Sequence, residues 1–384
     1  MSYSINRTFP LKLTTVTPVS IGGDQGKLLS PYADYVLSSD ESYVYYLQKE
    51  LIEKAVLEKQ KLGDYIRFIQ LGMDNNRSDF NLLDFIQNTL KLELNEVTSY
   101  KLPNWGLYAK DRKQIQPVVK SAGNPFIPGS SIKGALRTAM LYDWLANTSE
   151  GETELAKYFH EIELWRNRQK ADQRNLFVEE NLFGKLKDNK GQDSRRIKVS
   201  DTNCIKDGLV VLAAKRIRLK PEGKQSKSSD ILIPREAVFS EHPLHFKLSI
   251  EPSLSNPVLD YWEKEDIGGV LKIINAFAIA AIDNEIYELE HADDNKFKQE
   301  INSMLEFYHD LKQRADNGEI FLRIGFGKTQ YDNSLALALI RDEDKFLTFR
   351  KWLWKVSPKK EIHPVTRTVT PGGKPLGWVK LEPI

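Results

Sequence analysis

The chain is poor in the residues that build disulfides, thiol active sites and metal sites. It contains one cysteine, Cys204, which excludes an internal disulfide and is typical of a protein of the reducing cytoplasm. We interpret Cys204 as a small apolar side chain, because no histidine stands near it in the sequence. Among the six histidines only His242 and His245 are closely spaced, and strand alternation points their rings to opposite faces. The sequence therefore predicts no metal site.

A long hydrophobic run is also missing. The most apolar stretch, residues 273–282, is shorter than the roughly 20 residues that cross a bilayer. Residues 1–10 lack the apolar core of a signal peptide. Neither sign of charge dominates, since 55 Lys and Arg oppose 53 Asp and Glu, for a net charge of +2. We expect a cytoplasmic protein without a membrane partner, in which any nucleic-acid site is one locally basic face.

The most informative stretch runs from Asn124 to Met140 and predicts a helix start. Two prolines keep the approach extended, and Gly129 then permits a tight turn. Ser130 or Ser131 is placed to accept a backbone N–H bond and so cap the helix. The apolar residues that follow recur at helical spacing and predict a buried stripe.

Two cations, Lys133 and Arg137, stand one turn apart at this helix start. Unpaired N–H groups and the helix dipole attract phosphate there, so the pattern indicates a clamp for a phosphate backbone. The spacing alone also fits an ordinary amphipathic helix with solvated cations. A third interpretation, the Ser130–Lys133 pair of a penicillin-binding enzyme, needs Ser-Asp-Asn and Lys-Thr-Gly triplets, and the sequence has neither.

Five stretches, in order along the chain, together carry a family resemblance. They are Thr14–Gly23, Phe126–Thr138, Asn181–Gly184 with Arg195–Asp201, Phe321–Lys328, and Thr366–Arg367 with Leu376–Val379. These stretches resemble the RAMP superfamily of CRISPR proteins, and the last resembles the fifth Csm subunit of type III-A effector complexes. The resemblance covers most of the chain apart from about residues 47–100.

Interleaved strand and helix patterns predict an α+β protein with two ferredoxin-like, RRM-like βαββαβ domains, an architecture that the resemblance also implies. We expect an N-terminal RAMP domain at residues 1–250, with a helical insertion at about 47–100, and a C-terminal ferredoxin-like domain at 251–384. The elements expected from the patterns are strands at 11–16, 196–200, 209–219, 231–239, 244–250, 320–324 and 377–381, a hairpin at 32–47, and helices at 152–170, 267–289, 297–314 and 345–354.

Two glycine turns are predicted to approach a partner closely, because no side chain blocks the backbone there. One is Gly22-Gly23, and the other contains Gly325, flanked by Arg323 and Lys328, whose charges suit phosphate. Neither is a nucleotide-binding P-loop, because Leu322 stands where the first glycine of that motif belongs and the earlier turn is too short. We expect no cofactor. Plain tight turns with solvated cations remain the alternative.

The densest basic strand is Lys215–Lys220. Alternation predicts Lys215 on one face and Arg216 and Arg218 on the other, where they could follow a phosphate backbone or simply protect a solvated edge. The loop at 220–230 that follows is a candidate thumb intruding on a guide–target duplex.

Catalysis of RNA cleavage is not predicted. Many RAMP proteins carry a histidine just before the Ile-Gly of the first turn, but here Ser20 occupies that position, and a serine without a base cannot act as a general base. Asp34, Asp201 and the pair at 293–294 do not form a recognisable metal-hydrolysis set.

The sequence and the resemblance lead to one main hypothesis, a non-catalytic RNA-binding subunit of a type III-A CRISPR (Csm) interference complex. By resemblance it would bind the 3′ part of the crRNA, cap the backbone filament and support crRNA maturation in antiviral defence. The implied partners are crRNA, target RNA through the guide duplex, the backbone RAMP subunit and the small subunit, and host nucleases.

The alternatives are an endoribonuclease that trims crRNA precursors and an interaction protein that recruits nucleases through residues 47–100. The RNA-contacting residues expected are Gly129, Ser130, Ser131, Lys133 and Arg137, with Gly22, Gly23, Arg216, Arg218, Arg323, Gly325 and Lys328 as a second group.

Overall fold

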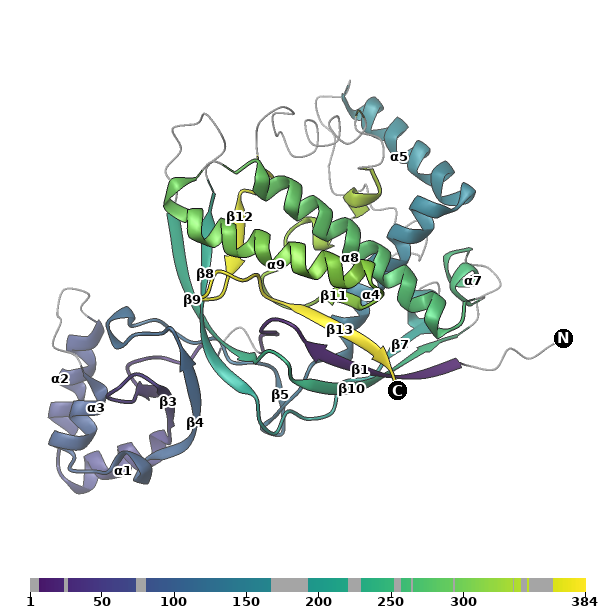
Figure 1. Cartoon of the computed structure of the whole chain (residues 1–384). Helices are drawn as coiled ribbons and strands as arrows, with labels where there is room; N and C mark the ends of the chain where they lie inside the picture. Colours follow the sequence, from purple (N-terminus) through teal and green to yellow (C-terminus); the bar gives the residue numbers. More distant parts are fainter. Residues whose placement is uncertain are drawn as a thin grey trace.

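The computed structural model is a mixed α/β protein built on two main sheets (Figure 1). It describes residues 7–23, 27–73, 81–166, 193–219, 229–251, 257–263, 265–292, 294–333, 335–339, 344 and 362–384. The α+β class expected from the sequence is confirmed. The helix predicted at 345–354, the Asn181–Gly184 stretch and residues 220–228 of the candidate thumb lie outside the described residues.

The first sheet, which we call sheet A, joins the two ends of the described chain. Its five strands are, in spatial order, β11 (Ile320–Arg323), β13 (Trp378–Pro383), β1 (Arg7–Thr15), β10 (Pro243–Ile250) and β7 (Ile197–Val199). All neighbours are antiparallel. Along β1 the buried residues alternate with partly exposed ones, which is the pattern of a sheet with one face on a core. Strands from both sides of residue 250 share this sheet, so the predicted domain boundary does not separate two sheets.

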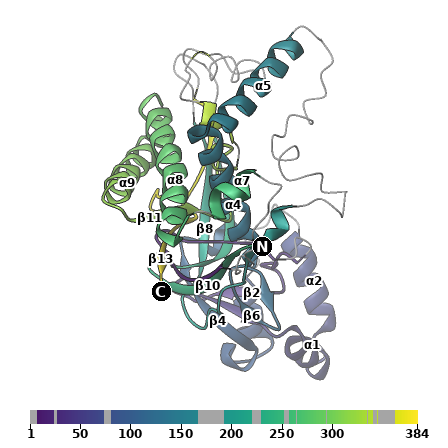
Figure 2. The same ribbon diagram turned by 90° about the vertical axis from the view of Figure 1, so that its right-hand side faces the viewer.

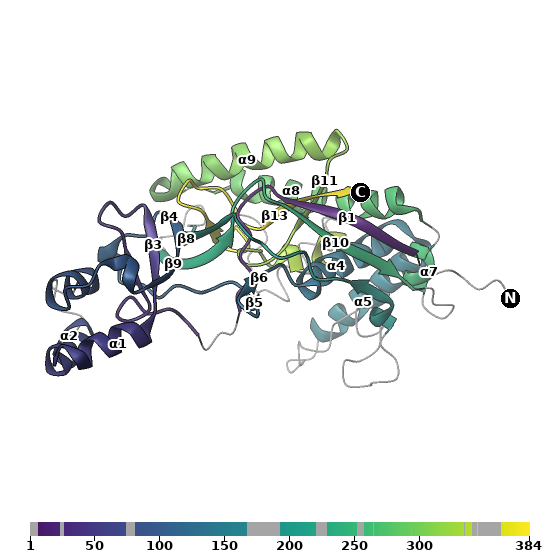
Figure 3. The same ribbon diagram turned by 90° about the horizontal axis from the view of Figure 1, so that it is seen from below.

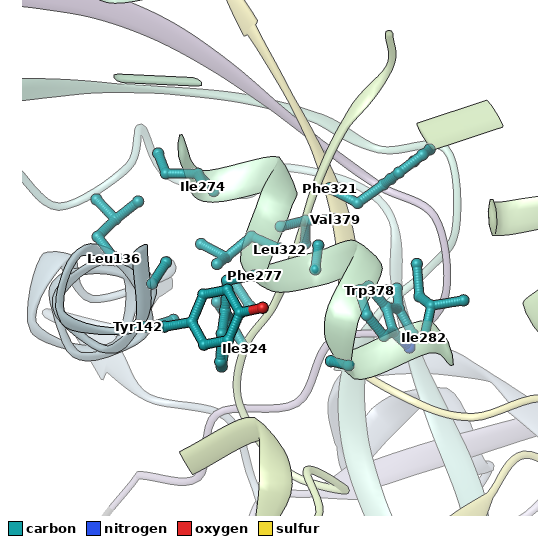
Figure 4. Close-up of a cluster of buried hydrophobic side chains, with 14 of the residues drawn as sticks. Leu136, Tyr142, Ile274, Phe277, Ile282, Phe321, Leu322, Ile324, Trp378 and Val379 are labelled. Atoms are coloured by element: carbon teal, nitrogen blue, oxygen red, sulfur yellow. The ribbon is translucent and has the colours of Figure 1, made fainter. Parts of the chain in front are cut away.

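Three long helices pack with sheet A. They are α4 (Gly129–Asn147), α8 (Ile267–Glu290) and α9 (Lys298–Asp316). Helix α8 lies between the other two and contacts β11, and Figure 4 shows side chains of α4, α8, β11 and β13 meeting in one cluster. The rings of Tyr142 and Phe277 lie 5.3 Å apart there. Helix α5 (Ser149–Arg166) continues from α4, and α7 (Pro257–Glu263) precedes α8.

Helix α8 is apolar because it is a core helix. It is the one described helix long and apolar enough to cross a membrane by length and composition. Most of its side chains between Val270 and Leu289 are buried, and they include Glu285, which forms a 2.7 Å ion pair with Arg367. Asp266 caps its first turn through a 2.7 Å bond to the Gly269 N–H. The predicted helix at 267–289 is confirmed.

The second sheet, sheet B, is built around a long curved ribbon of β8 and β9 (Figure 1). Its strands are β12 (Thr366–Val369), β8 (Leu209–Arg218), β4 (Thr98–Trp105), β3 (Tyr43–Leu47) and β2 (Tyr35–Leu37), with β9 (Ser229–Val238) paired to β8. A short hairpin of β5 (Lys120–Ser121) and β6 (Asn124–Pro125) leads into α4. The sequence patterns did not predict β4 or β12, because the first carries a proline and the second has four residues.

Helices within residues 49–89 form a block with a core of its own. It contains α1 (Lys49–Glu58), α2 (Leu62–Met73), α3 (Leu82–Asp84) and a π-helical turn at Phe85–Thr89. Buried residues such as Ile52, Val56 and Ile86 form a cluster separate from the main core. The block stands apart from α4, α8 and α9 in both the side view and the view from below (Figures 2 and 3).

Candidate nucleic-acid interface

The two predicted glycine turns, far apart in sequence, meet in space. The Phe326 N–H donates a 2.8 Å hydrogen bond to the carbonyl of Ser20, just before Gly22. Gly325 has φ +71°, and a Cβ there would lie 2.7 Å from the same carbonyl oxygen. Glycine is therefore needed at 325 both for its backbone conformation and for this close contact. The hydroxyl of Ser20 donates a 2.7 Å bond to the Glu236 carbonyl, so Ser20 joins β9 to both turns.

Arg323 braces the second turn from inside the protein. Its side chain is 3% exposed, lies 2.9 Å from Asp332, and donates to the carbonyls of Leu376 and Gly327 at 3.0 and 2.9 Å. This corrects the expectation that Arg323 would contact phosphate, because its donors are already used within the core. Lys328 is also half-buried, and this burial lowers its pKa.

Two arginines instead lie against Phe326, at the tip of this turn. The guanidinium carbon of Arg235 is 3.9 Å from the centroid of the Phe326 ring, and that of Arg216 is 5.7 Å away. Arg235 also donates a 3.0 Å bond to the Ser20 hydroxyl, and its terminal nitrogen lies 3.1 Å from where a Cβ on Gly22 would be. The arginines therefore connect both glycine turns.

This pair of arginines carries uncompensated positive charge. Burial, and to a smaller extent the charge of Arg216, together lower the pKa of Arg235 to about 10. Within the described part of the chain, neither side chain has a carboxylate in ion-pair contact. A partly desolvated cation such as Arg235, without a counter-ion, favours an external anion.

Arg235 was not predicted as a site residue, but it shares a face of the β8–β9 ribbon with Arg216. On the antiparallel ribbon Leu212 pairs with Arg235 and Arg216 pairs with Ile231, so the two arginines share a face. The predicted division of β8 is confirmed, since Arg216 and Arg218 are exposed while Lys215, on the other face, pairs with Glu300 at 2.7 Å.

The start of α4 differs from the sequence expectation. Its N-cap is Pro128, and no serine side chain caps it. The Gly129 N–H donates a 2.8 Å bond to Asp201, which follows β7, so a protein carboxylate occupies one of the donors that phosphate was expected to use. A Cβ on Gly129 would lie 2.3 Å from the Val199 carbonyl oxygen. Gly129 is thus explained by the packing of α4 on β7 rather than by a ligand.

A second cationic group remains on this helix. Lys133 and Arg137 are half-buried, whereas Ser130 is exposed and Ser131 half-buried. Burial lowers the pKa of Lys133, and the nearby charges of Arg137 and Arg195 lower it further. Arg195 lies in the short 3-10 turn before β7 and was not among the site residues predicted from the sequence, although it begins the stretch Arg195–Asp201 that carries the family resemblance. The expected residues therefore form two groups, one at α4 and one at the glycine turns.

The carboxylates weighed for metal chemistry have structural contacts. Asp34 accepts the Ser30 N–H at 2.6 Å and lies 2.6 Å from the Lys49 ammonium. Asp201 caps α4, and Asp294 accepts the N–H of Lys296 at 3.0 Å. No cluster of three or more potential metal ligands occurs among the described residues.

A comparison with known protein families shows which family this chain belongs to. The RAMP superfamily profile matches residues 12–330, which is most of the sequence. The chain belongs to the RAMP superfamily. It is similar to the CRISPR system Cms protein Csm5 of Methanocaldococcus jannaschii, with 22% identity over 97% of this chain and 88% of that protein. It is also 24% identical to Csm5 of Streptococcus thermophilus, over 63% of this chain and 64% of that protein.

Two solved structures share this fold. A chain of a Csm–crRNA–target RNA ternary complex of a type III-A CRISPR-Cas system superposes with a TM-score of 0.67 at 21% identity, covering 98% of this chain and 100% of that one. The crystal structure of T. onnurineus Csm5 superposes with a TM-score of 0.64 at 20% identity, covering 96% and 99%. The predicted resemblance to Csm5 proteins of type III-A systems is confirmed.

Proposed function

We propose that this RAMP protein is a non-catalytic, RNA-binding subunit of a type III-A Csm interference complex. In this role it binds the 3′ part of the crRNA, closes the end of the backbone filament and supports crRNA maturation. Its partners would be crRNA, target RNA through the guide duplex, and the backbone and small subunits. The similarity to Csm5 proteins and the fold shared with a chain of a Csm–crRNA–target RNA complex support the proposal.

The single observation that carries the RNA-binding part is the arginine pair on Phe326. Arg216 and Arg235 have no carboxylate partner among the described residues, and they lie where the two glycine turns meet. Guanidinium groups bind phosphate oxygens through fixed N–H pairs. A backbone contact of this kind suits a guide whose sequence varies, because it reads charge and shape rather than bases.

The test compares three double variants in a salt titration of crRNA binding. Arg216→Ala with Arg235→Ala removes the pair at the glycine turns, and Lys133→Ala with Arg137→Ala removes the pair on α4. We expect each to weaken binding and to flatten the slope of log affinity against log salt by about 1.4, since single strands release roughly 0.7 counter-ion per phosphate contact.

The control removes two exposed lysines from the helical block, Lys54→Ala in α1 and Lys59→Ala at its C-terminal cap. It loses the same net charge but should keep the wild-type slope. If the salt slope stayed unchanged in both variants that lose an arginine, the RNA-binding proposal would be wrong. Equal flattening of the slope in all three variants would indicate only a general charge effect.

The finer features of the sequence hypothesis belong to the same proposal. We propose a cytoplasmic location, a derivation of the two sheets from ferredoxin-like units, and a thumb role for the loop at 220–230. Recruitment of host nucleases through the helical block would leave crRNA bound but untrimmed when residues 49–97 are deleted. No arrangement of the described carboxylates favours the alternative endoribonuclease, which incubation of the chain with precursor RNA would detect directly.

A further inference from the structure

Sheet B ends in a short strand that has a neighbouring strand on one side. β2 is the outermost strand and pairs with β3 in antiparallel register from Tyr35 to Leu37. The Asp34 carbonyl accepts a 2.9 Å bond from β3, and the Ser38 N–H donates a 2.9 Å bond to it. Hydrogen-bonded residues alternate along an antiparallel strand with residues whose N–H and C=O groups point away from the neighbour. Because Asp34 and Ser38 are of the bonded kind, so is Val36, and the backbone groups of Tyr35 and Leu37 point outward.

These outward groups line a cavity. No described residue bonds to the N–H or C=O of Tyr35 or Leu37, and the two residues are only 4% and 8% exposed. An unpaired backbone group away from water costs about as much free energy as a lost hydrogen bond. A cavity of about 380 Å³ follows the strand, and its lining includes Tyr35, Leu37 and residues just beyond each end of β2. The strand edge therefore has both unused hydrogen-bonding groups and space for a partner.

One wall of the cavity is apolar. On the face of the sheet that bears Val36, it consists of Leu82 and Leu83 of α3, and Leu82 packs in one core cluster with Val36. Asn81 caps α3 through a 3.2 Å bond to the Asp84 N–H, which holds this wall in place. A strand added beside β2 would direct every second side chain toward these leucines, because side chains alternate between the two faces of a sheet.

The other wall is cationic. Tyr35 belongs to the opposite face, and its hydroxyl donates to the Lys113 carbonyl, which ties β2 to the segment that contains Lys110 and Arg112. Both of these cations line the cavity, together with one carboxylate, that of Glu41. Lys110 forms no ion pair with a described residue. The remaining side chains of an added strand would therefore meet net positive charge.

We propose that the edge of β2 is a docking site for an extended segment of a partner protein, which adds a strand to sheet B. Its backbone bonds to Tyr35 and Leu37, and its side chains alternate between apolar and acidic, facing the leucines and Lys110 in turn. An extended polypeptide fits this edge because it offers backbone N–H and C=O groups at strand spacing, which a helix or a nucleic acid does not. This inference goes beyond RNA binding and stands or fails independently of it.

The experiment titrates a labelled synthetic hexapeptide against the full-length chain. The peptide alternates valine with aspartate and is acetylated and amidated at its ends. We expect saturable binding, and weaker binding of a peptide with the same composition in which three valines precede three aspartates. Methylation of single backbone nitrogens tests the strand pairing itself. At alternate positions it should weaken binding about 2- to 13-fold, the equivalent of one hydrogen bond, and at the positions between them it should have little effect.

The cationic wall is tested by a change of charge. Lys110→Glu should weaken binding of this peptide about 1.4- to 5-fold, the range for one exposed ion pair, and should favour a peptide with lysine in place of aspartate. Lys113→Glu is the matched control, because Lys113 is also exposed in the same segment but does not line the cavity. It should bind the original peptide nearly as the wild type does.

Three results would overturn the proposal. The first is no saturable binding, or an equal effect of methylation at every position, because either result would mean that no strand pairs with this edge. The second is binding that appears only after residues 74–80 are replaced by a glycine–serine linker, which would mean that the chain supplies its own strand. The third is self-association that the peptide reverses, which would identify a second copy of the chain as the donor instead of a separate partner.

Discussion

Two glycines in the first turns of α4 should respond oppositely to alanine. A Cβ at Gly129 would lie 2.3 Å from the Val199 carbonyl oxygen and 2.6 Å from that of Ser200, against 3.4–4 Å for ordinary contact. The start of the helix must therefore move from β7 by about 1 Å, which also breaks the 2.8 Å bond from the Gly129 N–H to Asp201. Overpacking costs about 1–3 kcal/mol and a lost cap about 1 kcal/mol, so Gly129→Ala should lower the free energy of unfolding by about 2–4 kcal/mol.

Gly134 is the control, because it is exposed on the same helix and a Cβ there meets nothing within 4 Å. Gly134→Ala should raise the free energy of unfolding by about 0.5–1 kcal/mol through helix propensity. Chemical denaturation followed by circular dichroism measures both. If Gly129→Ala were as stable as wild type, α4 would not pack on β7 as described, and the explanation of this glycine by packing would be wrong.

Two further predictions concern charged groups outside the RNA-facing surface. Arg367→Met should cost about 3–5 kcal/mol in unfolding free energy, because it leaves the buried carboxylate of Glu285 without its 2.7 Å partner, and a loss below 1 kcal/mol would contradict the ion pair. Hydrogen bonds from the Ser38 hydroxyl and from Ser42 hold the pKa of Asp40 at about 2, below its usual 3.8. This carboxylate therefore contributes stability above pH 4 that is lost as the pH falls toward 2. Asp40→Asn should make the free energy of unfolding depend less steeply on pH between about 4 and 2. If this pH dependence were the same as in the wild type, Asp40 would not be responsible for it.

The sequence predicted the elements with strong periodicity. β1, β10 and α8 were expected because their apolar residues repeat at two or 3.6 positions over many residues. Alternation at every second residue also predicted which side chains of β8 lie on each face of the sheet. The family motifs identified both glycine turns in the sequence. That the two turns meet at Ser20 could not be predicted from either turn alone.

What the sequence did not reveal depends on tertiary contacts. The Gly129 N–H at the start of α4 donates to Asp201, 72 positions away in the sequence. Local capping rules instead favoured Ser130 or Ser131 as the cap. Arg323 looked like a surface cation until its ion pair with Asp332 and its two carbonyl partners placed it in the core. Arg235 becomes notable only because Phe326, in the glycine turn after β11, lies against it.

The position of β13 between β1 and β11 has a consequence for how the protein is made. The Trp378 N–H donates to the hydroxyl of Thr17, which lies 361 residues earlier in the chain. While a ribosome synthesises the protein, β1 can pair with β10 but must wait for most of the remaining sequence before its second neighbour exists. During that interval β1 exposes an unpaired strand edge, the kind of surface that chaperones shield and that aggregates recruit.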